Sequence, residues 1–385
     1  MLETRIAKEL AYISQAGLAR RITELYFVNP AQAQDRTGKT YLVLASNNYL
    51  GFTHAPEVIE AASQAALKFG TSGSRLTTGG TFIASELEKR LADFKHSESA
   101  LVFNTGYMTN LGVLYGLLQT GDVVFSDELN HASIIDGCRI SRCKVVVYKH
   151  NDMADLQRLL ETEIVTGQRF IVTDGVFSMD GDIADLPSLA VLKKQFNACL
   201  IVDDAHGVGV IGNDGSGTAS HYGLTDVIDL QVGTLSKALA AEGGYVAGKK
   251  ILIDYLINRS RPFIFSTALA PATLAAANAA LLLLQTQASK YLDSLRANSR
   301  LMRRLLLEGG LNVVEGITPI IPVVIGEAGL TMQFADRLKS KGILVSGIRP
   351  PTVPRGESRL RITVTAAHCE EQLRQAAPII TAPWH

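Results

Sequence analysis

The pattern that most constrains this chain is an alternation, from about residue 98 to residue 248, of short apolar runs and stretches with helical periodicity. Helical stretches such as Met108–Leu118 and Met153–Glu163 separate the runs. The strand-like runs are SALVF (99–103), DVVF (122–125), KVVVY (144–148), RFIVT (169–173), ACLIVDD (198–204), DLQVGT (229–234) and GGYVAG (243–248). Strands that are apolar throughout and separated by helices are typical of a parallel sheet covered on both faces. The pattern therefore predicts an α/β fold with a mostly parallel seven-stranded sheet.

The end of the chain has a different pattern. Between residues 318 and 364, the strand-like stretches TPIIPVVIG, GILVSGI and SRLRITV are interrupted by the proline-rich turn PPTVP. This predicts a smaller α+β domain, completed by the amphipathic N-terminal helix MLETRIAKELAYISQAG. A chain of 385 residues is long enough for two domains. We expect an N-terminal segment (1–45) that joins the small domain, a large domain (46–287) and a C-terminal small domain (288–385).

The composition excludes several classes of protein. Lys plus Arg and Asp plus Glu each total 37, so the net charge is zero and no basic surface for nucleic acid is expected. The run Ala268–Leu284 is apolar, but it contains Pro271, Thr273 and Asn278 and is rich in alanine. It is more typical of a packed internal helix than of a membrane span.

The cysteines and the N-terminus indicate a cytoplasmic protein. Four cysteines occur, and none forms a C-x-x-C pair: Cys138, Cys143, Cys199 and Cys369. This spacing favours reduced thiols over disulfides, and no metal site is expected. The N-terminal helix also lacks the apolar core of a signal peptide.

A glycine motif lies in the stretch LIVDDAHGVGVIGNDGSG (200–217), where GVGVIG matches the dinucleotide fingerprint G-x-G-x-x-G. That fingerprint should open a helix directly and follow an early strand of a βαβ unit. Here it follows five earlier strands and precedes NDGSGTASHYG, which is a poor helix start. We therefore interpret the glycines as serving another purpose than binding NAD.

The residues beside the glycines indicate chemistry at the carboxyl end of the sheet, where ligands bind in such folds. Asp203 ends an apolar strand, and His206 follows three residues later. Lys237 follows another apolar run, between Ser236 and a series of small residues. A lysine kept partly neutral by desolvation can form a Schiff base. An aspartate facing a pyridinium nitrogen together with such a lysine is typical of pyridoxal 5′-phosphate enzymes.

At this point the sequence resembles a known family. DDAHG (203–207) and GTLSKA (233–238) resemble the α-oxoamine synthases, a family of fold-type-I pyridoxal-phosphate enzymes. The likeness covers nearly the whole chain, through SNNYLGF (46–52), GSRLTTG (73–79), NTGYMTN (104–110), DELNHASIIDG (127–137), VTDGVFSMDGD (172–182), FSTALAP (265–271) and IRPPTVPRGESRLRITVTAAH (348–368). The resemblance implies a fold-type-I transferase that uses pyridoxal phosphate to condense an amino acid with an acyl thioester, with loss of CO2.

The segment IRPPTVP most resembles the branch that joins L-alanine to a pimeloyl thioester, carried on coenzyme A or on a carrier protein. The alternative within the family is a sister branch, such as the one that uses glycine and acetyl-CoA. A nicotinamide dehydrogenase and a non-catalytic subunit of the same fold are the alternatives from other classes. Lys237, Asp203 and His131 occur together, which argues against the last of these.

The resemblance implies a role for each residue around the cofactor. Lys237 binds the cofactor and removes the Cα proton, Asp203 keeps the ring nitrogen protonated, and His131 stacks on the ring. His206 and Ser178 form hydrogen bonds with the phenolic oxygen of the cofactor or help to position the substrates. The phosphate is bound by backbone N–H groups at a helix start and by hydroxyls: Gly106, Tyr107, Thr234, and Ser266 with Thr267 from a neighbouring subunit. The implied protein is a homodimer with its active site at the subunit interface.

Substrate contacts follow from the same resemblance. Arg361 is the candidate to bind the amino-acid carboxylate, with Arg359 as its rival on the same strand face. Arg20 is the candidate near the acyl thioester, with Arg21 as its rival, and Asn47 and Thr352 are further substrate contacts.

Two positions depart from the family pattern. Ala84 stands where a histidine is common, which leaves the acyl preference open. Ala240 stands where glycine is usual, which should tighten packing near the lysine.

Overall fold

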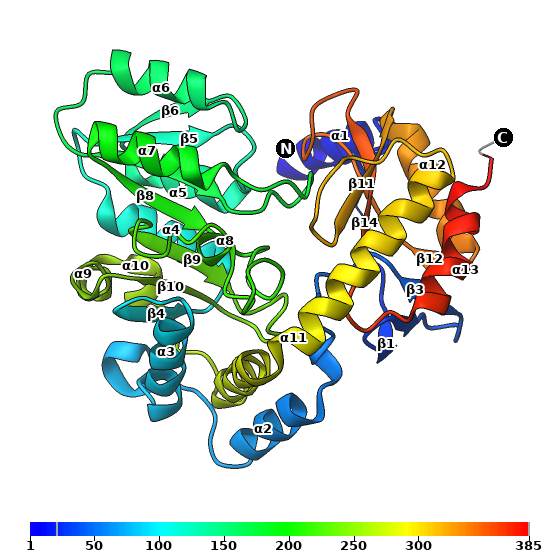
Figure 1. Cartoon of the computed structure of the whole chain (residues 1–385), viewed down its shortest axis with the longest axis horizontal. Helices are drawn as coiled ribbons and strands as arrows, with labels where there is room; N and C mark the ends of the chain where they lie inside the picture. The colour runs from blue at the N-terminus through cyan, green and yellow to red at the C-terminus, as the bar shows by residue number, and fades with distance from the viewer. Residues whose placement is uncertain (21, 384–385) are drawn as a thin grey trace. The chain divides into compact units, whose positions relative to one another are not determined.

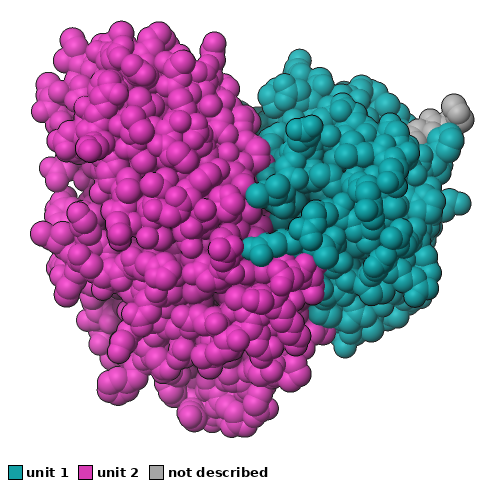
Figure 2. Space-filling view, in the orientation of Figure 1, with its two compact units in different colours: residues 1–47, 179–181, 296–385 teal, residues 48–178, 182–295 magenta. Residues whose placement is uncertain are grey.

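The computed structural model describes residues 1–20 and 22–383 (Figure 1). The chain divides into two compact units, coloured separately in Figure 2. Unit 1 comprises Met1–Asn47, Met179–Gly181 and Arg296–His385, and unit 2 comprises Asn48–Ser178 and Asp182–Leu295. The boundary between Leu295 of unit 2 and Arg296 of unit 1 lies within α11 (Pro271–Glu308). This helix is interrupted by the non-helical backbone of Gln287 (φ −132°, ψ 25°). The sequence boundary expected at 287/288 falls at this interruption, eight residues before the division between the units.

Unit 2 contains the seven-stranded sheet that the sequence predicts, in the order β4-β10-β9-β8-β7-β5-β6. The strands are β4 (Ser99–Phe103), β5 (Val123–Asp127), β6 (Lys144–Tyr148), β7 (Arg169–Asp174), β8 (Ala198–Asp203), β9 (Leu230–Thr234) and β10 (Gly244–Gly248). Only β10 runs antiparallel to its neighbours. The mostly parallel α/β fold is thus confirmed.

Successive strand residues point to opposite sides of the sheet, and both sides are buried except at the edge strand β6, where Val145 and Val147 are exposed. On β5, Val124 packs in one core cluster while Val123 and Phe125 pack in the other. The helices of unit 2 are α2 (Pro56–Ala66), α3 (Phe82–Phe94), α4 (Gly106–Leu117), α5 (Ala132–Ser141), α6 (Met153–Thr162), α7 (Leu186–Phe196), α8 (Thr218–His221), α9 (Lys250–Arg259) and α10 (Arg261–Ile264). The fully apolar strands of the sequence follow from this two-sided burial.

Unit 1 holds two small sheets. One has the order β1-β2-β3-β12 and the other the order β11-β14-β13. Their strands are β1 (Tyr26–Asn29), β2 (Gln32–Gln34), β3 (Thr40–Val43), β11 (Ile320–Gly326), β12 (Ile343–Leu344), β13 (Ser346–Ile348) and β14 (Ser358–Thr363). The helices are α1 (Leu2–Gln15), α12 (Ala328–Ser340), α13 (Glu370–Thr381) and the end of α11. Leu306, Ile321, Leu360 and Leu373 lie in their shared core, so the smaller domain is α+β as predicted.

The apolar run Ala268–Leu284 forms the start of α11. Its side chains Leu274, Ala277, Leu281 and Leu284 are buried within unit 2. Among the described residues, no helix is long and apolar enough to cross a membrane.

The glycine motif forms a loop and does not open a long helix. After β8, residues 204–217 are turns and bends, and the next helix, α8, has only four residues. The loop folds around the buried carboxylate of Asp204, which accepts hydrogen bonds from Lys95 Nζ at 2.8 Å and from Thr218 Oγ1 at 2.9 Å. A Cβ on Gly207 would lie 1.9 Å from Asp204 Oδ1, and one on Gly217 would lie 1.7 Å from Oδ2. These glycines are therefore required for the loop to close on Asp204.

Candidate active site

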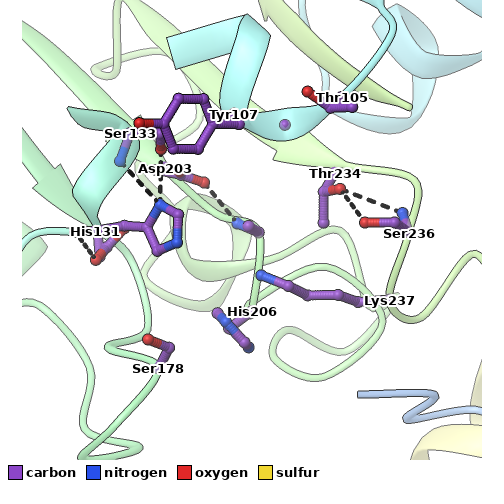
Figure 3. A pocket seen from close by; sticks show the side chains of 13 residues that line it. Thr105, Tyr107, His131, Ser133, Ser178, Asp203, His206, Thr234, Ser236 and Lys237 are labelled. Atoms are coloured by element: carbon purple, nitrogen blue, oxygen red, sulfur yellow. Dashed lines mark hydrogen bonds between the residues drawn. The ribbon is translucent and has the colours of Figure 1, made fainter. Parts of the chain in front are cut away.

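A pocket of about 270 Å³ lies in unit 2 at the carboxyl ends of the parallel strands (Figure 3). The ends of β7, β8 and β9 place Asp174, Asp203 and Thr234 there. The residues that line the pocket are Thr105, Gly106, Tyr107, His131, Ser133, Asp174, Ser178, Asp203, Ala205, His206, Thr234, Ser236 and Lys237. The structure thus brings together eight of the residues singled out in the sequence, and it adds five that were not.

Asp203 forms one wall of the pocket, and its carboxylate is held from two sides. Asn110 Nδ2 donates to Oδ2 at 2.6 Å, and the backbone N–H of Ala205 donates to Oδ1 at 3.0 Å. Asp203 is 6% exposed and Asn110 is 2% exposed. The carboxylate is therefore fixed in orientation, which is what a partner for a protonated ring nitrogen requires.

His131 caps helix α5 and faces into the same pocket. Its Nδ1 accepts from the backbone N–H of Ser133 at 3.2 Å and lies 2.7 Å from Ser133 Oγ. Solvent reaches the ring through the pocket, but the surrounding protein lowers the pKa of the imidazole below its ordinary value. The charge of Lys237 lowers this pKa further and that of Asp203 opposes the shift, so the neutral imidazole is favoured.

Asp174 is a second carboxyl beside Asp203, opposite it in the pairing of β7 with β8. Its Oδ2 accepts the backbone N–H of His131 at 2.9 Å. Burial and the neighbouring charge of Asp203 raise the pKa of Asp174 well above its ordinary value. The two carboxyls therefore favour one negative charge between them.

The start of helix α4 forms the end of the pocket where an anion fits. Thr105 caps the helix, and its Oγ1 accepts from the N–H of Met108 at 3.0 Å. The first N–H groups of a helix have no partner within it and attract anions. A Cβ on Gly106 would approach Thr234 Cβ to 3.2 Å, so a larger residue here would require Thr234 to shift by a few tenths of an ångström. The pocket thus combines a backbone anion site, a fixed carboxylate and a lysine, which fits pyridoxal phosphate.

The hydroxyls beside this anion site differ from the expectation. Thr234 Oγ1 donates to the carbonyl of Gly243 at 2.9 Å and lies 2.7 Å from Ser236 Oγ. Ser236 lines the pocket and is the more exposed of the two. The hydroxyl of Thr234 is therefore committed within the protein, and Ser236 is better placed to reach a ligand.

His206 and Lys237 complete the pocket. His206 Nδ1 lies 2.6 Å from the hydroxyl of Tyr49, a fully buried side chain of the motif SNNYLGF. Figure 3 shows Lys237 extending toward the side of the pocket where Asp203 and His206 lie. After Lys237 the backbone turns sharply, and Ala240 takes a left-handed conformation with φ of 52°. At this position glycine would adopt the turn without strain, so the alanine strains the backbone as well as filling space.

Two predicted substrate residues meet in unit 1. Arg361 donates to Asn47 Oδ1 at 3.1 Å and to Thr363 Oγ1 at 3.2 Å, and it is 4% exposed. The rival Arg359 forms ion pairs with Asp180 and Glu357. Two carboxylates of the protein already pair with the guanidinium of Arg359, and the choice of Arg361 as the residue that binds a substrate carboxylate stays a prediction.

A second cavity in unit 1, of about 300 Å³, contains Arg20 and Thr352. Arg349 also lines it and donates to the carbonyl of Ala19 at 3.1 Å. Arg21, the rival of Arg20, lies outside the described residues.

Ser266 and Thr267 do not line the pocket of their own chain. Asn104 Nδ2 donates to the carbonyl of Thr267 at 2.9 Å, and Thr267 pairs with Ser74 in an isolated bridge. Their assignment to a neighbouring subunit stays a prediction.

The sequence reasoning missed Tyr49, Asn110, Ser133, Asp174 and Ser236. Asp174 could have been found, because it directly follows the predicted strand RFIVT (169–173), as a polar residue at the carboxyl end of the sheet. Asn110 lies one helical turn after Gly106 and so on the same face of the helix, which is a weaker indication of a place near the site than the position of Asp174. Tyr49 and Ser133 lie in motifs quoted above, but their contacts with His206 and His131 depend on the tertiary structure.

Comparison with known proteins assigns the chain to a family. The model of the family "Aminotransferase class I and II" matches residues 39–380. The chain belongs to this family. It is 47% identical over 374 residues to the 8-amino-7-oxononanoate synthase of Lysinibacillus sphaericus, covering 97% of this chain and 96% of the relative. It is 50% identical over 379 residues to the enzyme of the same name from Trichlorobacter lovleyi, covering 98% and 96%.

A solved structure gives the same result. A serine palmitoyltransferase variant from S. paucimobilis, with bound PLP–myriocin, superposes with a TM-score of 0.92 at 32% identity and covers 98% of this chain and 96% of its own. The resemblance to the α-oxoamine synthases is confirmed.

Proposed function

We propose that the protein condenses L-alanine with a pimeloyl thioester, releasing CO2 and the free thiol to give 8-amino-7-oxononanoate, a precursor of biotin. The observation that carries this proposal is the full-length similarity to curated synthases of that name, at 47–50% identity. These relatives favour this reaction over the one that uses glycine and acetyl-CoA. The pocket that joins Lys237, Asp203 and His131 provides the chemistry, with pyridoxal phosphate as the cofactor.

Each side chain of the pocket has a defined task. Pyridoxal phosphate, when bound, supplies an electron-withdrawing ring that stabilises negative charge at the substrate Cα. The fixed carboxylate of Asp203 holds a proton on the ring nitrogen, and the start of α4 binds the phosphate. Lys237 Nζ would hold the cofactor, and it would also remove and later return the proton at the substrate Cα. His131, which lines the same pocket, would contact the ring when the cofactor is bound.

Two groups in unit 1 would bind the substrates. Arg361, held by Asn47, binds the carboxylate of L-alanine through its guanidinium fork. Arg20 and Thr352 contact the acyl thioester from the second cavity. The thioester is pimeloyl-CoA or its carrier-protein equivalent.

We also propose that the protein is a cytoplasmic homodimer. Ser266 and Thr267 would reach the phosphate in the partner's pocket, since they do not line their own. All four cysteines are free thiols, which suits a reducing compartment.

The experiment that tests the reaction is thiol release by the protein loaded with pyridoxal phosphate. Pimeloyl-CoA with L-alanine is compared with acetyl-CoA plus glycine and palmitoyl-CoA plus L-serine. We expect release only with the first pair. Preference for another pair would contradict the choice of substrates, and no release from any pair would contradict the proposed activity.

A further inference from the structure

A chain of hydrogen bonds links two residues that line the pocket, Asp203 and His131. Its two intermediate members, Asn110 on α4 and Ser133 on α5, are 2% and 1% exposed. Asn110 Nδ2 is 2.6 Å from Asp203 Oδ2 and 2.9 Å from Ser133 Oγ, and Ser133 Oγ is 2.7 Å from His131 Nδ1. Asn110 lies outside the residues that line the pocket, and Ser133 contributes to its wall.

The direction of each hydrogen bond follows from the chemistry of the groups. The carboxylate of Asp203 only accepts, so the amide atom of Asn110 that faces it must be the nitrogen. That NH2 group has a second hydrogen, which Ser133 Oγ accepts. The backbone N–H of Ser133 also points at His131 Nδ1, at 3.2 Å, so this nitrogen is an acceptor and the hydroxyl of Ser133 donates to it.

The same reasoning fixes the protonation of His131. Nδ1 already faces two donors, the hydroxyl and the backbone N–H of Ser133 at 3.2 Å. A hydrogen on Nδ1 would meet both of them, so the neutral ring carries its hydrogen on Nε2. Figure 3 shows this nitrogen pointing away from Ser133, toward the open side of the pocket.

We propose that Asn110 and Ser133 are positioning residues that fix His131 as a neutral Nε2–H donor and couple its tautomer to the carboxylate of Asp203. The role of this donor in catalysis rests on the proposed function, whereas the tautomer itself does not. The charged or titratable groups that face His131 in the described part of the chain are Asp203, Lys237, Asp174, which accepts its backbone N–H, and Tyr107, whose ring packs edge-on with its centroid 6.4 Å from that of His131. The hydrogen-bond chain through Asn110 and Ser133 therefore sets which ring nitrogen of His131 presents a hydrogen to a ligand. The charged and titratable groups set how readily the ring becomes charged.

The test is ¹⁵N NMR of the protein loaded with pyridoxal phosphate and labelled at its histidines. The chain has eight histidines, and the spectrum of His131→Gln identifies the signals of His131. We expect wild-type protein to show an unprotonated Nδ1 and a protonated Nε2. A protonated Nδ1 in the wild type would overturn the proposal without any variant being needed.

Two variants test the hydrogen-bond chain through Asn110 and Ser133. Ser133→Ala removes the hydroxyl and Asn110→Leu removes the amide that orients it, so both should shift the His131 signals toward a mixture of tautomers. Both should also raise the pH at which His131 titrates, because a hydrogen bond to the neutral ring is lost. Ser141→Ala is the matched control, since this serine of α5 donates to the carbonyl of Cys138. It should leave the His131 signals unchanged.

Unchanged His131 signals in Asn110→Leu would overturn the coupling to Asp203, because Asn110 makes no hydrogen bond to His131. Thiol release from the pimeloyl-CoA and L-alanine pair is measured on the same samples. For Ser133→Ala we expect kcat/KM to fall roughly three- to tenfold, the effect of one neutral hydrogen bond. Absence of thiol release in the wild type would contradict the proposed function, whereas the NMR result alone decides the tautomer.

Discussion

The buried ion pair of Lys95 and Asp204 allows a quantitative prediction. The distance from Lys95 Nζ to Asp204 Oδ2 is 2.8 Å, and the two side chains are 0% and 1% exposed. Lys95→Met keeps the length of the side chain and leaves the carboxylate buried without its cation. Breaking a buried pair from one side costs about 3–5 kcal/mol. In this variant Asp204 keeps the hydrogen bonds from Thr218, so we expect the loss in the free energy of unfolding to be near the lower end of this range, about 3 kcal/mol.

Urea unfolding followed by circular dichroism measures this loss. Lys250→Met is the matched control, because Lys250 pairs with Asp254 at 2.6 Å while the two side chains are 67% and 52% exposed. An exposed helical pair of this kind contributes about 0.3–0.5 kcal/mol. The double variant Lys95→Met with Asp204→Asn should lose less stability than the sum of the single variants, since it leaves no unpaired buried charge. If Lys95→Met loses no more stability than Lys250→Met, the argument that this pair closes the glycine loop is wrong.

Three further predictions concern the strained turn, a charged histidine and the two arginines of β14. Ala240→Gly should stabilise the protein by about 0.5–1 kcal/mol in the same urea assay. Glycine removes the strain of the left-handed backbone, and this gain exceeds the cost of the greater conformational entropy of the unfolded chain. A loss of stability would contradict the presence of strain at Ala240. Burial lowers the pKa of His150, but the hydrogen bonds that its ring donates to Asp127 and Asp182 outweigh this and raise the pKa to about 10. The stabilising effect of His150 is therefore complete below about pH 6.5 and disappears as the pH rises through 10. The difference in unfolding midpoint between wild type and His150→Gln should therefore shrink between these pH values, and a constant difference would exclude the charged histidine. Arg361→Lys should raise the KM for L-alanine roughly tenfold through loss of a charged hydrogen bond, whereas Arg359→Lys should leave that KM within about a factor of two; equal effects would contradict the assignment.

The sequence predicts the large domain well because its signal is local and repeated. Each strand of the seven-stranded sheet is a continuous apolar run, and burial on both faces makes such runs unambiguous. The small sheet of β1, β2 and β3 escaped prediction, because its strands are three or four residues long and partly polar. Short strands of this kind depend on their partners in the sheet and not on their own composition.

The candidate site was predictable only in part. Residues carried by strand ends and motifs, such as Asp203 and Lys237, were found from the sequence. The choice of Arg361 over Arg359 came from the motif alone, because strand alternation places both on one face. The structure adds that Arg359 pairs with Asp180 and Glu357. The glycine motif likewise became interpretable once Asp204 was seen inside its loop.

The most direct test of the proposed chemistry follows the carboxyl carbon of the amino acid. L-Alanine labelled at its carboxyl carbon is incubated with pimeloyl-CoA and the protein loaded with pyridoxal phosphate, and labelled CO2 and 8-amino-7-oxononanoate are measured together. We predict equal amounts of both from the wild type, neither when the thioester is omitted, and neither from Lys237→Ala. Labelled CO2 without the thioester, or product formation that survives the loss of Lys237, would contradict the account.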